Sequence, residues 1–166
     1  MNRVRYETDL YDPMKKWLEK YLSDKYRNSA ESIIAVDSHS VTLETVLNNY
    51  NILTQYPQAV GVNIQVDVLG IAKLKNRADI YFIEAKKTSL SLRDLGQLWA
   101  YCKLINPAAA FLLSSEGLGG LNTILKTYAR EDMLDFGNGK MLKKMQVAKW
   151  DVSRNTIDSN SIIPKL

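Results

Sequence analysis

Residues 66–87 read VDVLGIAKLKNRADIYFIEAKK, and this stretch decides the fold. Its two apolar halves are rich in β-branched and aromatic residues, so each predicts a strand, and the short polar linker 73–77 predicts a hairpin. Side chains alternate between the faces of a strand, which places Glu84 and Lys86 on one face, beside Asp67 of the neighbouring strand. Carboxylates supply the oxygen ligands that Mg²⁺ prefers. Two carboxylates beside a cation are what metal-dependent hydrolysis of a phosphodiester requires.

A purely structural role competes with this interpretation. Glu84 and Lys86 can form a cross-strand salt-bridge set on a solvated face of a sheet. The Glu-x-Lys spacing is also short enough to arise by chance from ordinary composition. It falls, however, at the end of an apolar strand, where an unpaired buried charge is costly and needs a reason. The metal site is therefore the favoured hypothesis.

Composition narrows the chemistry that this chain can use. It has one cysteine, Cys102, and one histidine, His39, so a Cys/His zinc site and two-histidine mechanisms are excluded. His39 falls in a predicted turn, where a surface position is the favoured prediction. Any hydrolytic chemistry must therefore use carboxylates, lysine and hard metal ions.

Length and charge suggest the class of protein. The 166 residues fit a single domain over 1–166. The net charge of +4 and the pI of about 9.1 are consistent with a polyanionic partner. No apolar run has membrane length and the first residues are charged and polar, so we expect a cytoplasmic protein without a membrane partner.

The rest of the chain predicts alternating helices and strands. Helices are expected over 9–26, 41–53, 92–105 and 121–129, and strands over 32–36, 60–72, 78–87 and 108–113. Residues 140–150 fit either a basic helix or a strand. Trp99 is expected in the core, on the apolar stripe of its helix. This order predicts an α/β protein with a mixed central β-sheet flanked by helices on both faces.

The order of elements, with Asp67 and Glu84-Ala85-Lys86 on the hairpin, resembles the PD-(D/E)XK nuclease superfamily, which includes many restriction endonucleases and the archaeal Holliday junction resolvases. The resemblance covers about 7–114 and implies a restriction-endonuclease-like fold, with 115–166 as a C-terminal extension. It implies that Asp67, Glu84 and the carbonyl of Ala85 bind the metal. It also implies that Lys86 orients the attacking water or stabilises developing charge.

Two further site residues follow from the same resemblance. Members often carry a Glu in the first helix, and Glu7 is the first candidate, ahead of Glu19 and Asp12. The run 97–101, QLWAY, resembles a Gln-x-x-x-Tyr element of some members, which implies that Gln97 helps to hold the active site. The chain departs from the family at Val66, where a proline is common. It also carries a second hairpin carboxylate, Asp79, that competes with Asp67 for the metal role.

The implied function is a divalent-metal-dependent DNA endonuclease that uses Mg²⁺, or Mn²⁺ in its place, and no organic cofactor. The expected phosphate contacts are basic residues near the site and in the extension: Lys73, Lys75, Arg77, Lys87 and Arg93, then Lys143 and Lys144. A homodimer is compatible with this function, because cutting both strands of a duplex takes two sites.

Two alternatives remain open. One is a non-catalytic nucleic-acid-binding or assembly subunit that retains the nuclease fold. The other is an enzyme of a different class in which Glu84 and Lys86 act as a general acid–base pair. The sequence gives the second no small-molecule site, because no glycine-rich phosphate loop follows a strand. Divalent-metal binding separates the nuclease from the non-catalytic subunit.

Overall fold

The fold is built on one mixed β-sheet in the computed structural model, which describes residues 4–139 and 141–165. In this part of the chain the sheet has six strands that lie side by side in chain order. They are β1 (Ser32–Asp37), β2 (Val68–Lys73), β3 (Ala78–Lys86), β4 (Ala109–Ser114), β5 (Gln146–Asp151) and β6 (Thr156–Ile157). The pairings of β1, β2 and β3 are antiparallel, those of β3, β4 and β5 are parallel, and β6 returns antiparallel to β5.

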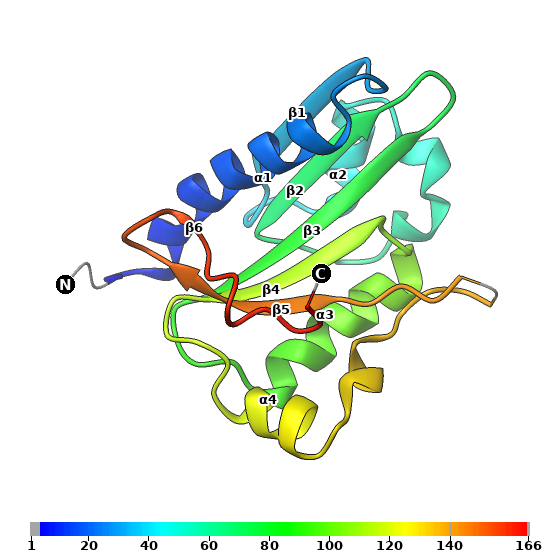
Figure 1. The fold of residues 1–166 in the computed structure, drawn as a ribbon. Coiled ribbons are helices and arrows are strands. Elements are labelled where there is room, and N and C mark those ends of the chain that lie inside the picture. Colours follow the sequence, from blue (N-terminus) through cyan, green and yellow to red (C-terminus); the bar gives the residue numbers. More distant parts are fainter. Residues whose placement is uncertain (1–3, 140, 166) are drawn as a thin grey trace.

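Helices cover both faces of this sheet (Figure 1). The α-helices are α1 (Tyr11–Lys25), α2 (Leu43–Asn49), α3 (Leu92–Ile105) and the single turn α4 (Gly120–Asn122). Short 3₁₀ turns lie at η1 (Glu7–Leu10), η2 (Leu53–Gln55), η3 (Pro57–Ala59) and η5 (Glu131–Leu134), and η4 (Thr123–Thr127) is a π-helical turn. No helix within the described residues combines the length and apolar character needed to cross a membrane.

Two apolar cores form, one on each side of the sheet. Helix α1 packs over one face, where Tyr81 and Phe111 lie. Helices α2 and α3 pack over the other face, where Phe82 and Leu112 lie. The predicted α/β class with a mixed sheet and helices on both faces is therefore confirmed.

The central hairpin also forms as predicted. Strands β2 and β3 pair from Val68 with Ile83 to Lys73 with Ala78. Along β3, Phe82 belongs to the core beneath α2 and α3, whereas Ile83 and Ala85 belong to the core beneath α1. Successive side chains of β3 therefore point to opposite faces of the sheet, as the alternation in the sequence predicts.

A glycine lets α1 approach β2 closely. A Cβ built on Gly70 would lie 2.7 Å from Leu22 Cδ1 and 2.8 Å from Leu18 Cδ2. Both leucines are fully buried. The absence of a side chain at this position therefore sets the distance between the helix and the sheet.

Three predicted elements differ in the structure. The helix expected over 41–53 is shorter, since α2 ends at Asn49 and the separate 3₁₀ turn η2 begins at Leu53. The strand expected over 60–72 begins only at Val68, because the backbone before it bonds elsewhere: the Ile64 carbonyl accepts the Leu43 N–H at 2.8 Å and the Val66 carbonyl accepts the Ser38 hydroxyl at 2.6 Å. The helix expected over 121–129 is divided into α4 and η4.

Residues 140–150, for which the sequence left helix and strand open, contain most of the strand β5. Residue 140 lies outside the described residues. Through β5 and β6 the C-terminal extension joins the same sheet as the hairpin.

Candidate active site

Asp67 and Glu84 lie opposite each other where β2 begins and β3 ends. The ladder ends with the pair of Val68 and Ile83, so Asp67 and Glu84 are the next residues beyond it, and the Asp67 side chain reaches the Ala85 N–H at 2.8 Å. Directly opposite residues have their side chains on the same face of a sheet. Both side chains are buried, with only 9% of Asp67 and 5% of Glu84 exposed. The structure therefore brings the two predicted carboxylates together.

A hydrogen bond holds the Asp67 carboxylate in place. Its Oδ2 accepts the backbone N–H of Ala85 at 2.8 Å, and Tyr11, at the start of α1, lies close enough for the Asp67 charge to raise the pKa of its hydroxyl. The Asp67 and Glu84 carboxyl groups lie close enough for each to affect the pKa of the other, so the two groups titrate as a pair. The sequence does not single out Tyr11, because a tyrosine on the buried stripe of a helix looks like any core residue.

Burial dominates the electrostatics of this pair. Burial and then the Asp67 charge raise the pKa of Glu84 to about 9. Burial also raises the pKa of Asp67, although hydrogen bonds from Ala85 and Glu84 oppose the rise. Burial and the nearby Asp67 and Glu7 charges raise the pKa of Tyr11 well above its usual range. A site with no cation therefore keeps Glu84 protonated at neutral pH, and a bound divalent cation would favour its ionised form.

Glu7 reaches the same end of β3 from η1. Its Oε2 accepts the backbone N–H of Lys87 at 3.3 Å, and its charge adds to the raised pKa values of Asp67 and Glu84. The weaker first-helix candidates lie elsewhere: the Asp12 carboxylate pairs with Lys16 at 2.8 Å. Glu19 is exposed on α1. Of the three acidic residues, Glu7 is therefore the one that the structure brings to the carboxylate pair.

Lys86 stands at the rim of the pair. It is two residues beyond Glu84 on the same face of β3 and is half-buried. Its charge opposes the rise in the pKa of Glu84. Its Nζ lies 3.9 Å from Asp94 Oδ1 at the start of α3, where Asp94 also forms a capping box with Ser91. The sequence alone does not predict that Asp94 holds the lysine, because the capping box already accounts for an acidic residue there.

The residues present fit a hard divalent cation. Glu84 Oε2 is buried and has no hydrogen-bond partner in the described part of the chain, which leaves a ligand atom free inside the site. A strand residue exchanges its N–H and C=O bonds with the same neighbour, so the Ala85 carbonyl faces the side where its N–H meets Asp67. Two carboxylates and a main-chain oxygen suit Mg²⁺, which keeps several waters.

The acidic set is nevertheless small. Within residues 4–139 and 141–165, no three or more His, Cys, Asp or Glu side chains gather closely enough to hold a metal ion. Asp79, the second hairpin carboxylate, is not near Asp67, because it pairs with Ala72 far along the ladder and accepts from Arg77 at 3.0 Å. It therefore does not compete for the same cation.

The expected phosphate contacts separate into two groups. Lys87 directly follows β3, at the end of the strand that carries Glu84, and Arg93 lies in the first turn of α3. The linker residues Lys73, Lys75 and Arg77 lie at the opposite end of the hairpin, about 20 Å away at 3.4 Å per strand residue. Their expected place near the site is therefore corrected, since a hairpin puts its turn at the end opposite its free ends.

Other predicted residues make contacts of their own. Lys143 donates to Asn106 Oδ1 at 3.1 Å, and Lys144 pairs with Asp135 at 2.6 Å. Gln97 is exposed on α3 and donates to the Tyr101 hydroxyl at 3.3 Å. This bond stays within the Gln-x-x-x-Tyr element and does not reach the carboxylate pair.

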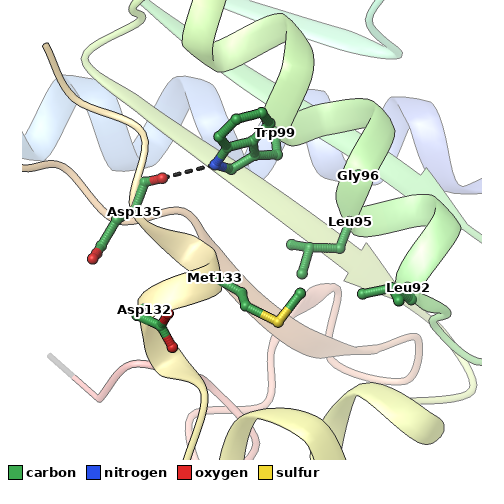
Figure 2. Close-up of a pocket in the computed structure, with 7 residues that line it drawn as sticks. All are labelled: Leu92, Leu95, Gly96, Trp99, Asp132, Met133 and Asp135. Atoms are coloured by element: carbon green, nitrogen blue, oxygen red, sulfur yellow. Dashed lines mark hydrogen bonds between the residues drawn. The ribbon is translucent and has the colours of Figure 1, made fainter.

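A separate hollow lies between α3 and η5. It has a volume of about 460 Å³ and is lined by Leu92, Leu95, Gly96, Trp99, Asp132, Met133 and Asp135. Figure 2 shows Leu95 and Met133 facing each other across it and the Trp99 indole donating to the Asp135 carbonyl at 2.8 Å. Trp99 is 38% exposed here, which corrects its expected core position. None of the predicted site residues lines this hollow.

Comparisons with protein-family models, with curated proteins and with solved structures found no match for this chain.

Proposed function

We propose that this chain is a divalent-metal-dependent DNA endonuclease with a restriction-endonuclease-like fold. The observation that carries the proposal is the buried contact of Asp67 with Glu84, with Lys86 on the same face. A buried pair of like acidic groups is costly unless a cation or a shared proton offsets it. The unpartnered Glu84 Oε2 adds support, because a ligand atom without a partner is what a metal site leaves when no metal is bound.

Asp67, Glu84 and the Ala85 carbonyl would hold one or two Mg²⁺ ions. When bound, Mg²⁺ would polarise the scissile phosphate and lower the pKa of a bound water. Lys86 offers an ammonium at the rim of the pair, where it orients the attacking water or offsets charge on the phosphorane-like transition state. Asp94 holds that ammonium in place. Lys87 and Arg93 bind the DNA phosphates on either side of the scissile one.

Cleavage of supercoiled, linear and branched DNA with Mg²⁺ or Mn²⁺ tests this function. We expect wild-type cleavage, and a loss of about 10²-fold or more in Asp67→Asn and in Lys86→Ala, because each removes a group that acts on the transition state. Glu7→Gln should cause a smaller loss. Glu19→Gln removes a carboxylate from the exposed side of α1 and is the matched control that should keep full activity.

A wild-type protein that cleaves no substrate with either metal would overturn the endonuclease proposal. DNA binding without metal binding would then favour the non-catalytic subunit. Unchanged cleavage in Asp67→Asn would show that the activity does not come from this pair.

A further inference from the structure

The single histidine lies in the turn between β1 and α2 and is held by an aspartate. Its Nδ1 lies 2.5 Å from Asp37 Oδ1, and the same oxygen accepts the His39 backbone N–H at 3.2 Å. A carboxylate on Nδ1 orients the ring and leaves Nε2 as the nitrogen that can meet a ligand. Within the described residues, Nε2 makes no hydrogen bond, so it is free to meet a ligand.

Two contacts fix this turn beside the carboxylate pair. The N–H of Ser38 donates to the carbonyl of Asp67 at 3.0 Å, so the residue before His39 touches the backbone of a predicted metal ligand. The His39 ring also packs on the ring of Tyr11, with centroids 4.8 Å apart, and Tyr11 is near enough to Asp67 for the Asp67 charge to raise its pKa. These two contacts place the His39 turn next to Asp67 and Tyr11.

The exposure of the ring suits contact with a substrate. The side chains of His39 and Asp37 are 39% and 41% exposed, so the pair opens to solvent at the edge of the site. The charged and titratable groups that face the ring are Asp37 from β1 and Tyr11 from α1. The Lys86 ammonium, at the rim of the carboxylate pair, lies 3.9 Å from Asp94 Oδ1.

We propose that His39 is a further catalytic residue that protonates the leaving oxygen of the scissile phosphodiester, with Asp37 as its positioning residue. This inference rests on the proposed endonuclease function. The attacking water forms a new P–O bond and releases a proton to solvent. The P–O bond to the leaving group breaks, and its electron pair stays on that oxygen, which takes the proton from Nε2. The neutral ring then takes a proton from solvent.

A substrate with sulfur in place of the leaving oxygen tests this role. A thiolate leaves without protonation, so loss of a general acid should harm only the oxygen substrate. We expect His39→Gln to cleave the oxygen substrate about 10²-fold more slowly than wild type, and the sulfur substrate within about threefold of wild type. Asp37→Asn should also cleave the oxygen substrate more slowly than wild type, by a smaller factor than His39→Gln. It should cleave the sulfur substrate at close to the wild-type rate. Mn²⁺ affinity and the free energy of unfolding should stay near wild type in both variants.

Asp67→Asn is the control, because loss of a metal ligand should slow both substrates alike. An equal defect of His39→Gln on both substrates, or no defect on either, would overturn the role of His39 and leave the endonuclease intact. A wild-type protein that cleaves neither substrate would overturn the endonuclease proposal itself and the role of His39 with it.

Discussion

The substitution Glu84→Gln should change how the stability of the metal-free protein depends on pH. Burial and the Asp67 charge raise the pKa of Glu84 from 4.5 to about 9. Between these values the folded protein holds one proton more than the unfolded chain, so the free energy of unfolding falls as the pH rises. One proton corresponds to a loss of about 4 kcal/mol between about pH 5.5 and about pH 8.5. Glutamine has nearly the shape of a protonated glutamate and does not titrate, so the variant lacks this loss.

Urea unfolding in EDTA, followed by circular dichroism across this pH range, measures the effect. The informative quantity is the difference in free energy of unfolding between wild type and Glu84→Gln, because groups that the substitution leaves unchanged contribute equally to both proteins and cancel. Near pH 5.5 the variant should be more stable than wild type by only about 1 kcal/mol, since most of the loss lies above this pH. Near pH 8.5 the variant should be the more stable protein by a wider margin. If the free energies of unfolding of the two proteins differed by the same amount at every pH, the reasoning would be refuted. That result would mean that Glu84 is ionised in the folded protein without a metal.

Three further outcomes follow from other contacts. Mn²⁺ binding near pH 7 should release about one proton, seen by calorimetry in buffers of different ionisation enthalpy, because the metal displaces the proton of Glu84, whose pKa burial raises to about 9; an affinity independent of pH would contradict this. Gly70→Ala should lower the free energy of unfolding by about 1–3 kcal/mol in urea, because its Cβ would lie 2.7 Å from Leu22 Cδ1; a neutral effect would mean that α1 moves without cost. Ser91→Ala should cost about 1 kcal/mol of thermal or urea stability, because it removes a cap that accepts from the Asp94 N–H at 3.3 Å, with the exposed Ser29→Ala as the control.

The elements that were predicted correctly from the sequence are those whose boundaries depend on neighbouring residues. Helix α3 spans Leu92–Ile105 as predicted, since a Ser91 cap begins it and the left-handed Asn106 before Pro107 ends it. The hairpin needs only its own residues to pair. The expected strand over 60–72 fails for the opposite reason. The backbone carbonyls of its first half accept hydrogen bonds from the Leu43 N–H and the Ser38 hydroxyl. Both donors lie more than 20 residues earlier in the chain, so no local sequence pattern predicts these bonds.

The sequence by itself determined the α/β order, the hairpin and the shared face of Glu84 and Lys86, because strand alternation acts over neighbouring residues. Tertiary structure alone decided which distant groups meet this face. Glu7 lies 80 positions from the Lys87 N–H that it accepts. His39 reaches the site only because its turn bonds to Asp67 and its ring packs on Tyr11. Such contacts depend on how α1 and the β1–α2 turn pack against the sheet, and residues so far apart in the chain carry no local pattern of their pairing.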